Sequence, residues 1–274
     1  MKKIRADEVL FEQIALPSLQ LSRALIMEGR VMQGDRKILK TSELIDPNSK
    51  LRVRGEIDAY VSRGAHKLKK ALEVFRIDLS DQVCMDIGAS TGGFTDVMLR
   101  GGASRVYAVD VGYNLLDYRL RSDQRVVCME RTNARFIEPE QFNPRPRFGA
   151  TDVSFISLKA ILPAAFRVLG EAGRFVALVK PQFEALPNEV GERGVVRDPE
   201  VQIRVLNEIA AFVPTLNWRV NGLSYSPIRG PEGNIEFLMD MTPEGSQLPS
   251  TEVSVRDTVQ AAYDKFLKSL GKGL

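Results

Sequence analysis

Two lysines and two carboxylates stand at positions where this chain could present them to a ligand. They are Lys67 before a first apolar strand-like run, Asp152 after the fourth run and Lys180 after the fifth. The fourth residue, Glu236, lies in the last two runs, which a short turn connects. Lys180 lies between RFVALV and Pro181, so its amine should emerge from a buried strand tip. A lysine amine can take up a proton or stabilise negative charge, so together these residues could activate a nucleophile. Local sequence also allows Asp152 to be a helix cap and Glu236 a surface strand residue.

A glycine-rich turn follows the first of these strand-like runs. In VCMDIGASTGGFTDVML the apolar run ends at Asp86 and the turn opens a helix. Glycines let the main chain approach a ligand closely, and free N–H groups at a helix start can receive a carboxylate. The spacing of Gly88, Gly92 and Gly93 does not fit the dinucleotide fingerprint G-x-G-x-x-G, and no G-K-[ST] follows. The residues predicted to bind the ligand here are Asp86, Gly88, Ser90, Thr91, Gly92, Gly93 and Phe94. A tight strand-to-helix turn without a ligand is the alternative.

Two further polar residues follow the next strand-like runs. Asp110 ends VYAVD, where a carboxylate can accept hydrogen bonds from the ribose hydroxyls of an adenosine. Asn133, in ERTNARF, could bond the adenine edge. On local grounds Asp110 could instead cap a helix, and Asn133 could simply form a turn.

From residue 60 onward, strand-like and helix-like segments alternate. The strand-like runs are VCMDIG, RVYAVDVG, RVVCME, FGATDVSF, RFVALVKPQ, WRVNGLSYSP and NIEFLMDM. This alternation predicts a doubly wound, mainly parallel α/β sheet of the Rossmann-like class. The last two runs are joined by the turn IRGPEGN without a helix, which predicts an antiparallel terminal hairpin. Such a hairpin is typical of S-adenosylmethionine-dependent methyltransferases.

The first 54 residues have a different pattern. ADEVLFEQIAL and LQLSRALIMEGRVMQ predict two amphipathic helices, the second stopped by Gly29, and short strands follow at Val31–Met32 and at 50–53. We therefore expect a small α+β domain at 1–54, a polar linker at 55–60 and the α/β domain at 61–274, with a last helix at 251–270.

Composition narrows the class of protein. The net charge of +3 is too small to establish a polyanionic partner, and the two cysteines, Cys84 and Cys128, suggest buried thiols without a disulfide framework or a metal site. No apolar run is long enough for a membrane helix, and MKKIRADEVL has no secretion-signal core. These features predict a cytoplasmic protein that needs neither membrane nor metal.

With these motifs in order, the chain resembles the TlyA-type hemolysin or ribosomal RNA 2′-O-methyltransferase family, which is related to the FtsJ-like methyltransferases. YVSRGAHKL, DIGASTGGFTD, VYAVDVGY, ERTNAR, DVSFISL, ALVKPQFE, VGERGVVRD and GPEGNIEFL carry the resemblance. It implies a catalytic tetrad of Lys67, Asp152, Lys180 and Glu236, and S-adenosylmethionine as cofactor, with Asp152 also near the cofactor. The implied reaction is methylation of a ribose 2′-hydroxyl, of a cytidine, in ribosomal RNA or a ribosomal subunit.

A ribose hydroxyl is a poor nucleophile, so we expect Lys180, oriented by Asp152, to deprotonate or polarise it. Lys67 and Glu236 would position the ribose. The first domain resembles a small RNA-binding fold of a ribosomal small-subunit protein and of pseudouridine synthases, and a basic segment, YVSRGAHKLKKALE, follows the linker. The predicted RNA contacts are Arg5, Arg23, Arg30, Arg36, Lys37, Ser62, Arg63 and His66.

Three other functions remain open from the sequence alone. A membrane-active hemolysin would use the C-terminal helix and would release dye from liposomes. A catalytically silent RNA-binding or assembly factor would bind RNA without transferring a methyl group. A small-molecule methyltransferase would not need the N-terminal domain or the basic segment.

Overall fold

A computed structural model describes residues 3–16, 19–54, 60–248 and 253–268 of the 274-residue chain. The chain divides into two compact units, an N-terminal unit at Met1–Arg63 and a C-terminal unit at Gly64–Leu274. Residues 55–59 of the predicted linker lie outside the described residues, as do residues 251, 252, 269 and 270 of the predicted last helix. The two units are described separately below.

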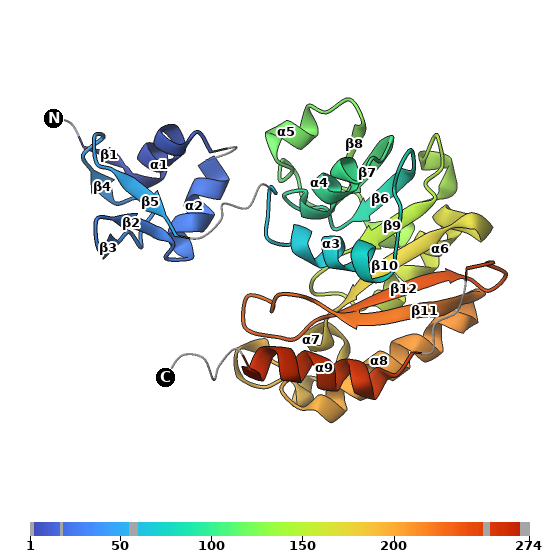
Figure 1. Ribbon diagram of the computed structural model, residues 1–274. Coiled ribbons are helices and arrows are strands. Elements are labelled where there is room, and N and C mark those ends of the chain that lie inside the picture. Colours follow the sequence, from blue (N-terminus) through green and yellow to red (C-terminus); the bar gives the residue numbers. More distant parts are fainter. Residues whose placement is uncertain (1–2, 17–18, 55–59, 249–252, 269–274) are drawn as a thin grey trace. The chain divides into compact units, whose positions relative to one another are not determined.

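The N-terminal unit combines two helices with short strands (Figure 1). Its elements are β1 (Ile4–Arg5), α1 (Ala6–Ile14), α2 (Leu19–Met27), β2 (Val31–Gln33), β3 (Arg36–Lys37), β4 (Leu44–Ile45) and β5 (Leu51–Val53). β2 pairs antiparallel with both β3 and β5, and β1 pairs with β4. The predicted helices and the β2–β5 pair are confirmed, including the end of the second helix before Gly29. Sequence patterns did not reveal β1, β3 and β4.

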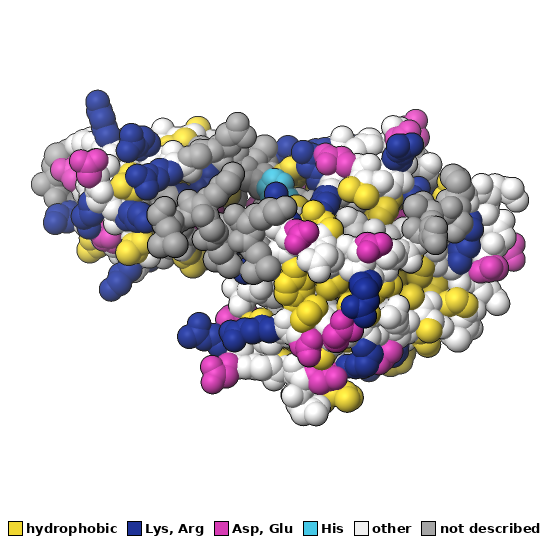
Figure 2. Space-filling view, turned by 60° about the horizontal axis from the view of Figure 1, so that its bottom comes forward, with side chains coloured by type: hydrophobic (Ala, Val, Ile, Leu, Met, Phe, Trp, Pro, Cys, Tyr) yellow, Lys and Arg dark blue, Asp and Glu magenta, His cyan; other side chains and the backbone are white. Residues whose placement is uncertain are grey.

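A small apolar core holds this unit together. Leu10 of α1 and Leu25 and Ile26 of α2 are almost fully buried against Val31 and Ile38. The helices thus bury one apolar face each and leave their charged side chains in solvent. Figure 2 shows Lys and Arg side chains, in dark blue, over the visible part of this unit.

The C-terminal unit contains the predicted α/β sheet. Its strands are β6 (Val83–Ile87), β7 (Arg105–Val109), β8 (Val126–Met129), β9 (Phe148–Thr151), β10 (Arg174–Val179), β11 (Trp218–Tyr225) and β12 (Phe237–Pro243). They lie in the order β11-β12-β10-β9-β6-β7-β8. Strands β6 to β10 are parallel, whereas β12 is antiparallel to β10 and β11 is antiparallel to β12. The predicted fold class and terminal hairpin are therefore confirmed.

Helices cover both faces of this sheet (Figure 1). They are α3 (Ala65–Val74), α4 (Gly93–Arg100), α5 (Tyr118–Arg121), α6 (Leu162–Leu169), α7 (Pro181–Glu184), α8 (Pro199–Phe212) and α9 (Val255–Lys268). The largest apolar cluster joins one face of the sheet to α6, α8 and α9, with Phe175, Phe237 and Met239 fully buried in it. Against the strands, α3 and α4 pack together. The strand order reverses between β6 and β9, because β7 and β8 follow on one side of β6 and β9 and β10 on the other, and a doubly wound sheet binds its ligands at such a point.

Candidate active site

The register of the sheet brings the two lysines and two carboxylates to one edge. Asp152 directly follows β9 and Lys180 directly follows β10, so both stand at the carboxyl edge of the parallel strands. Because β12 runs antiparallel to β10 and Phe237 pairs with Val179, Glu236 lies beside Lys180. Lys67 reaches the same point from the first turns of α3. Four separate elements therefore build one cluster.

Ion pairs connect these four side chains in series. The Lys67 amine lies 2.9 Å from Oε2 of Glu236 and donates a hydrogen bond of 3.0 Å to Oδ2 of Asp152. The Lys180 amine lies 2.5 Å from the other oxygen of Asp152, Oδ1. Asp152 thus bridges the two lysines, and Lys67 bridges the two carboxylates. We call these four residues the tetrad.

The tetrad is largely buried and contains two lysines and two carboxylates. Exposed fractions are 7% for Lys67, 8% for Lys180 and 1% for Glu236, and the side chain of Asp152 is 20% exposed. Burial acts to lower the pKa of Lys67, but the charges of Asp152 and Glu236 outweigh it and hold that pKa above its usual value. For Asp152, burial acts to raise the pKa, yet Lys67 and Lys180 hold it below its usual value. Lys67 is therefore a cation and Asp152 an anion at neutral pH.

The hairpin turn fits closely around Glu236. The Ser226 N–H donates a 2.8 Å hydrogen bond to the Glu236 carbonyl, and the Gly230 N–H donates one of 2.9 Å to the Asn234 carbonyl. A Cβ atom added at Gly230 would lie only 2.8 Å from Oε1 of Glu236. Glycine at this position therefore leaves the space that the carboxylate occupies.

The glycine-rich turn lies beside the tetrad, at the carboxyl end of β6. Gly88 has a φ of +80°, and a Cβ there would lie 3.2 Å from the Asp152 carbonyl oxygen, so the close approach of the segments that follow β6 and β9 requires glycine. Gly92 and Gly93 open α4, as predicted from the sequence. The predicted residue Phe94 is 3% exposed, so its ring belongs to the core. Thr91 is half-buried in the turn.

One carboxylate oxygen of Asp86 is buried and accepts no hydrogen bond from the described residues. Oδ2 accepts hydrogen bonds from the N–H and hydroxyl of Thr95 at 2.8 and 2.7 Å, whereas Oδ1 is buried without a hydrogen-bond partner among the described residues. Burial, opposed by the Thr95 bonds and assisted by the charges of Asp152 and Asp110, raises the pKa of Asp86 to about 7. A buried acceptor without a partner costs free energy, so a ligand that donates a hydrogen bond here would stabilise the site.

Asp110 and Asn133 are both partly engaged by the chain. Asp110 accepts hydrogen bonds from the N–H groups of Ser90, at 2.8 Å, and Gly112, at 2.7 Å, which fixes its carboxylate between two loops. The Oδ1 atom of Asn133 accepts from the Arg135 N–H at 3.1 Å and caps a short 3-10 helix. Asp110 therefore does not cap a helix, since α5 begins only at Tyr118 and has Asp117 as its N-cap, whereas Asn133 does close a turn. Both side chains follow parallel strands at the carboxyl edge of the sheet.

Most of the arginines predicted to contact RNA are occupied within the N-terminal unit. Arg5 and Arg23 both donate to the fully buried carboxylate of Asp7, at 2.8 to 2.9 Å. Arg30 donates to the Arg54 carbonyl and Arg36 pairs with Glu43 at 2.7 Å. These contacts give Arg5 and Arg23 a structural role that the sequence did not reveal.

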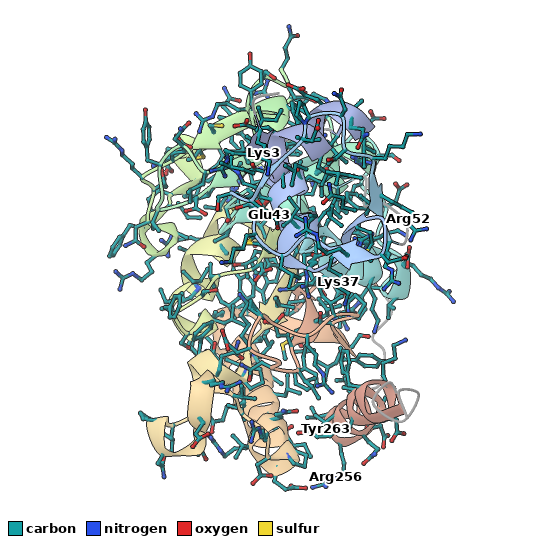
Figure 3. All side chains as sticks on the ribbon, turned by 90° about the vertical axis from the view of Figure 1, so that its left-hand side faces the viewer. Lys3, Lys37, Glu43, Arg52, Arg256 and Tyr263 are labelled. Atoms are coloured by element: carbon teal, nitrogen blue, oxygen red, sulfur yellow. The ribbon has the colours of Figure 1, made fainter. Side chains whose placement is uncertain are left out.

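Other basic side chains of this unit are more accessible. Lys37 and Arg52 are exposed and form no ion pair with any described residue (Figure 3). Arg63, at the end of the unit, is exposed, and Ser62 is half-buried. His66 lies half-buried in the first turn of α3, in the C-terminal unit.

Three residues around Lys180 were missed by the sequence analysis. The Lys180 amine also lies within hydrogen-bond distance, 3.0 Å, of the Ser154 hydroxyl. Phe155 is 90% exposed and has a φ of +63°, and its ring lies 5.0 Å from that of Phe183. Serine and phenylalanine at the second and third positions after Asp152 in TDVSFIS were the available signal, because an apolar ring in a loop of ligand-binding residues has no obvious place in the core.

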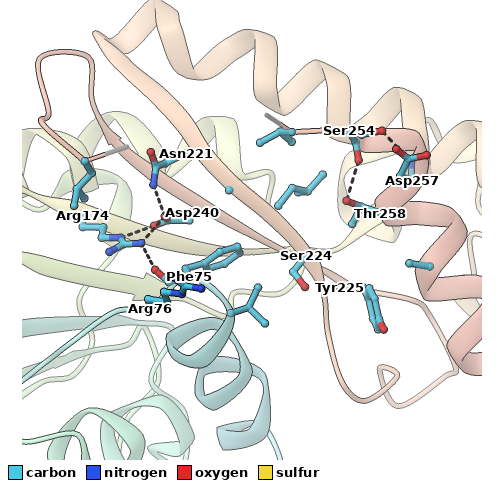
Figure 4. Close-up of a pocket in the computed structure, with 16 residues that line it drawn as sticks. Phe75, Arg76, Arg174, Asn221, Ser224, Tyr225, Asp240, Ser254, Asp257 and Thr258 are labelled. Atoms are coloured by element: carbon cyan, nitrogen blue, oxygen red, sulfur yellow. Dashed lines mark hydrogen bonds and ion pairs between the residues drawn. The ribbon is translucent and has the colours of Figure 1, made fainter. Parts of the chain in front are cut away.

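A separate cavity of about 770 Å³ lies along β11, and none of the tetrad lines it (Figure 4). On its wall Arg174 of β10 donates to both oxygens of Asp240, at 2.8 and 2.9 Å, and Asn221 donates to the same carboxylate. These bonds tie β10, β12 and β11 together. Tyr225 lines the cavity near α9.

The described residues contain no group of three or more His, Cys, Asp and Glu side chains that could hold a metal ion. Within the same described ranges, no helix is long and apolar enough to cross a membrane.

Comparisons with known proteins agree with this site. Residues 60–241 match the model of the FtsJ-like methyltransferases. The 16S/23S rRNA (cytidine-2′-O)-methyltransferase TlyA of Mycobacterium tuberculosis is 41% identical over 239 residues, 87% of this chain and 89% of that protein. YqxC of Bacillus subtilis, provisionally named an rRNA methyltransferase, is 45% identical over 92% of both chains. A solved structure from Streptococcus thermophilus, provisionally called a hemolysin, has a TM-score of 0.80 and 42% identity over 99% of this chain and all of that one. The chain therefore belongs to the FtsJ-like methyltransferase family, in the group of relatives that includes TlyA.

Proposed function

We propose that this protein transfers the methyl group of S-adenosylmethionine to the ribose 2′-hydroxyl of a cytidine in ribosomal RNA. The observation that carries the proposal is the largely buried, ion-paired tetrad beside the glycine-rich turn of a methyltransferase sheet. The name of the Mycobacterium tuberculosis relative supports both the nucleoside and the RNA. A ribosomal substrate also implies that the protein works in the cytoplasm.

The glycine-rich turn and two acids fit the cofactor. The free oxygen of Asp86 can accept a hydrogen bond from the amino group of its methionine part, and the N–H groups at the start of α4 can receive the carboxylate. Asp110 retains acceptor capacity for ribose hydroxyls, and Asn133 has an amide N–H₂ for the adenine edge. When bound, S-adenosylmethionine supplies an electrophilic sulfonium methyl group.

Within the tetrad, the two lysines have different surroundings. Lys67 contacts two carboxylates, which keep it as a cation that holds Asp152 and Glu236 in place. Lys180 contacts one carboxylate and one hydroxyl, which leaves one of the three directions of its amine for a substrate. We therefore assign to Lys180 the deprotonation or polarisation of the 2′-hydroxyl, and to Asp152 its orientation. Alignment of the hydroxyl with the methyl group would contribute much of the rate.

Phe155 provides a place for the base of the target nucleotide. Its exposed ring follows Asp152 and Ser154, both of which contact the Lys180 amine. Exposed aromatic rings bind unstacked bases in RNA, and a base out of the helix leaves its ribose accessible. Phe155, with Phe183 beside it, would thus hold the nucleotide while Lys180 meets its ribose.

The experiment measures transfer of radiolabelled methyl from S-adenosylmethionine to undermethylated small and large ribosomal subunits. Wild-type protein should label RNA on a ribose, and Lys180→Ala should abolish labelling while retaining cofactor binding. Lys159→Ala is the matched control, because Lys159 is a half-exposed lysine of the same unit that pairs with Glu208. An active Lys180→Ala variant would contradict the assignment. Cofactor binding without label in either subunit would favour a silent RNA-binding factor.

A further inference from the structure

A second group of cations lies outside the tetrad, against two aromatic rings. The Lys70 amine of α3 lies 3.4 Å from the centroid of the Tyr225 ring at the end of β11. The Arg229 guanidinium, in the hairpin turn, lies 4.9 Å from the centroid of the Phe266 ring of α9. The two rings pack edge to face at 6.4 Å. With Lys265 of α9, we call these residues the basic aromatic cluster.

The three cations of this cluster have no acidic partner. Lys70, Arg229 and Lys265 form no ion pair within the described part of the chain, and the buried Nε of Arg229 has no hydrogen-bond partner there. The next lysine along α3, Lys69, does pair with Glu73, at 3.5 Å. Burial and the nearby charge of Lys265 lower the pKa of Lys70 to about 8. Bringing an anion to the cluster would relieve this repulsion.

The basic aromatic cluster and the tetrad are built on the same elements. Lys67 and Lys70 are three residues apart on α3 and so lie on neighbouring positions of one helix face. Tyr225 pairs with Phe237, the residue after Glu236. Arg229 precedes Gly230, which packs against the Glu236 carboxylate. Since β11 runs in the same direction as β10, Tyr225 also stands at the carboxyl edge of the sheet.

We propose that Lys70, Arg229 and Lys265 bind the phosphodiester backbone of the RNA whose ribose enters the tetrad. The inference rests on the proposed function and extends its substrate contact to α9 and the hairpin. Cations without acidic partners suit a polyanion, because each phosphate contact releases a counterion. The adjacent tetrad requires an RNA strand to pass this edge of the sheet, and that favours RNA over other anionic partners.

The test measures binding of wild-type, Lys70→Gln, Lys265→Gln and Lys69→Gln proteins to undermethylated large ribosomal subunits at several salt concentrations. Lys69→Gln is the matched control, since it removes a neighbouring positive charge that already has an acidic partner. Lys70→Gln and Lys265→Gln should each weaken binding on the order of fivefold and reduce the slope of log affinity against log salt by about one. Cofactor binding should be unchanged. Should Lys70→Gln fail to fold, the exposed Lys265 still tests the surface.

Several results would overturn the inference. Wild-type affinity and salt slope in both variants would do so, as would an equal loss in Lys69→Gln. A loss of binding to phosphatidylglycerol vesicles, with subunit binding unchanged, would assign the cluster to a membrane instead. Failure of the proposed function would look different, because wild-type protein would then transfer no methyl group to either subunit.

Discussion

Removing Lys67 should destabilise the C-terminal unit, because this one amine neutralises two buried carboxylates. In Lys67→Met the side chain keeps its length but loses its charge. Asp152 retains Lys180 as a partner, whereas Glu236, whose side chain is 2% exposed, retains none among the described residues. A buried carboxylate without a counter-charge is the main source of the expected loss.

The magnitude follows from the burial of the pair. Breaking a buried ion pair by deleting one partner costs about 3–5 kcal/mol. For a unit of this size, about 1 kcal/mol shifts the melting temperature by roughly 2–4 °C, so we expect a decrease on the order of 6–20 °C. The exposed pair of Lys69 and Glu73 gives the control, and Lys69→Met should change stability by less than about 1 kcal/mol.

The single tryptophan makes the assay specific to this unit. Trp218 is 4% exposed and stacks on Phe166 with ring centroids 3.9 Å apart. Its fluorescence during urea unfolding of the full chain therefore reports the C-terminal unit and not the N-terminal one. Unfolding curves at pH 7 give the free energy of unfolding for each variant.

The double variant Lys67→Met/Glu236→Gln tests the cause of the loss. Replacing the carboxylate by a neutral amide removes the buried charge, so the double variant should be more stable than Lys67→Met by about 1–3 kcal/mol. A loss below about 1 kcal/mol in Lys67→Met, or a double variant less stable than the single one, would refute the reasoning that charge neutralisation holds the tetrad.

Three further predictions concern other parts of the chain. Burial acts to raise the pKa of Asp7, but Arg5 and Arg23 hold it below its usual 3.8. The Asp7 carboxylate therefore stabilises the N-terminal unit above about pH 4, and this stabilisation is lost as the pH falls through the lowered pKa. Amide NMR signals of the N-terminal unit in an acid titration would show the loss. Gly230→Ala should displace the Glu236 carboxylate and reduce methyl transfer at least tenfold while cofactor affinity, measured by calorimetry, stays the same; unchanged transfer would contradict the close fit. Phe155→Ala should weaken RNA binding by about 1–3 kcal/mol in a filter-binding assay, whereas Phe155→Trp should retain it, and equal binding by all three proteins would exclude stacking.

Much of the C-terminal unit follows from local sequence. Each predicted strand is a short apolar run ended by glycine, proline or a charged residue, as expected for strands of a parallel sheet that is buried on both faces. The hairpin followed from the lack of a helix between its two runs. Asp152 and Lys180 were placed at strand ends by the same reasoning, although the roles of all four tetrad residues came from the family resemblance.

Other features depend on packing that local sequence does not contain. An aspartate in the first turn of a helix is usually exposed. Only the three-dimensional structure shows that Asp7 is fully buried and paired with Arg5 and Arg23. The strands β1, β3 and β4 have two residues each, too few for an alternating pattern. The 90% exposure of Phe155 depends on the path of the loop after Asp152. These properties come from contacts between residues distant in the sequence or from loop geometry.

The order of the last two strands affects how this protein is made on the ribosome. β11 is synthesised before β12, yet β12 occupies the place between β11 and β10. Until residue 243 has left the ribosome, β11 has no partner strand and β10 keeps an open edge. Chains with such unpaired strand edges are prone to aggregate. Glu236 enters just before β12, so the growing chain completes its tetrad only when this last strand closes the sheet.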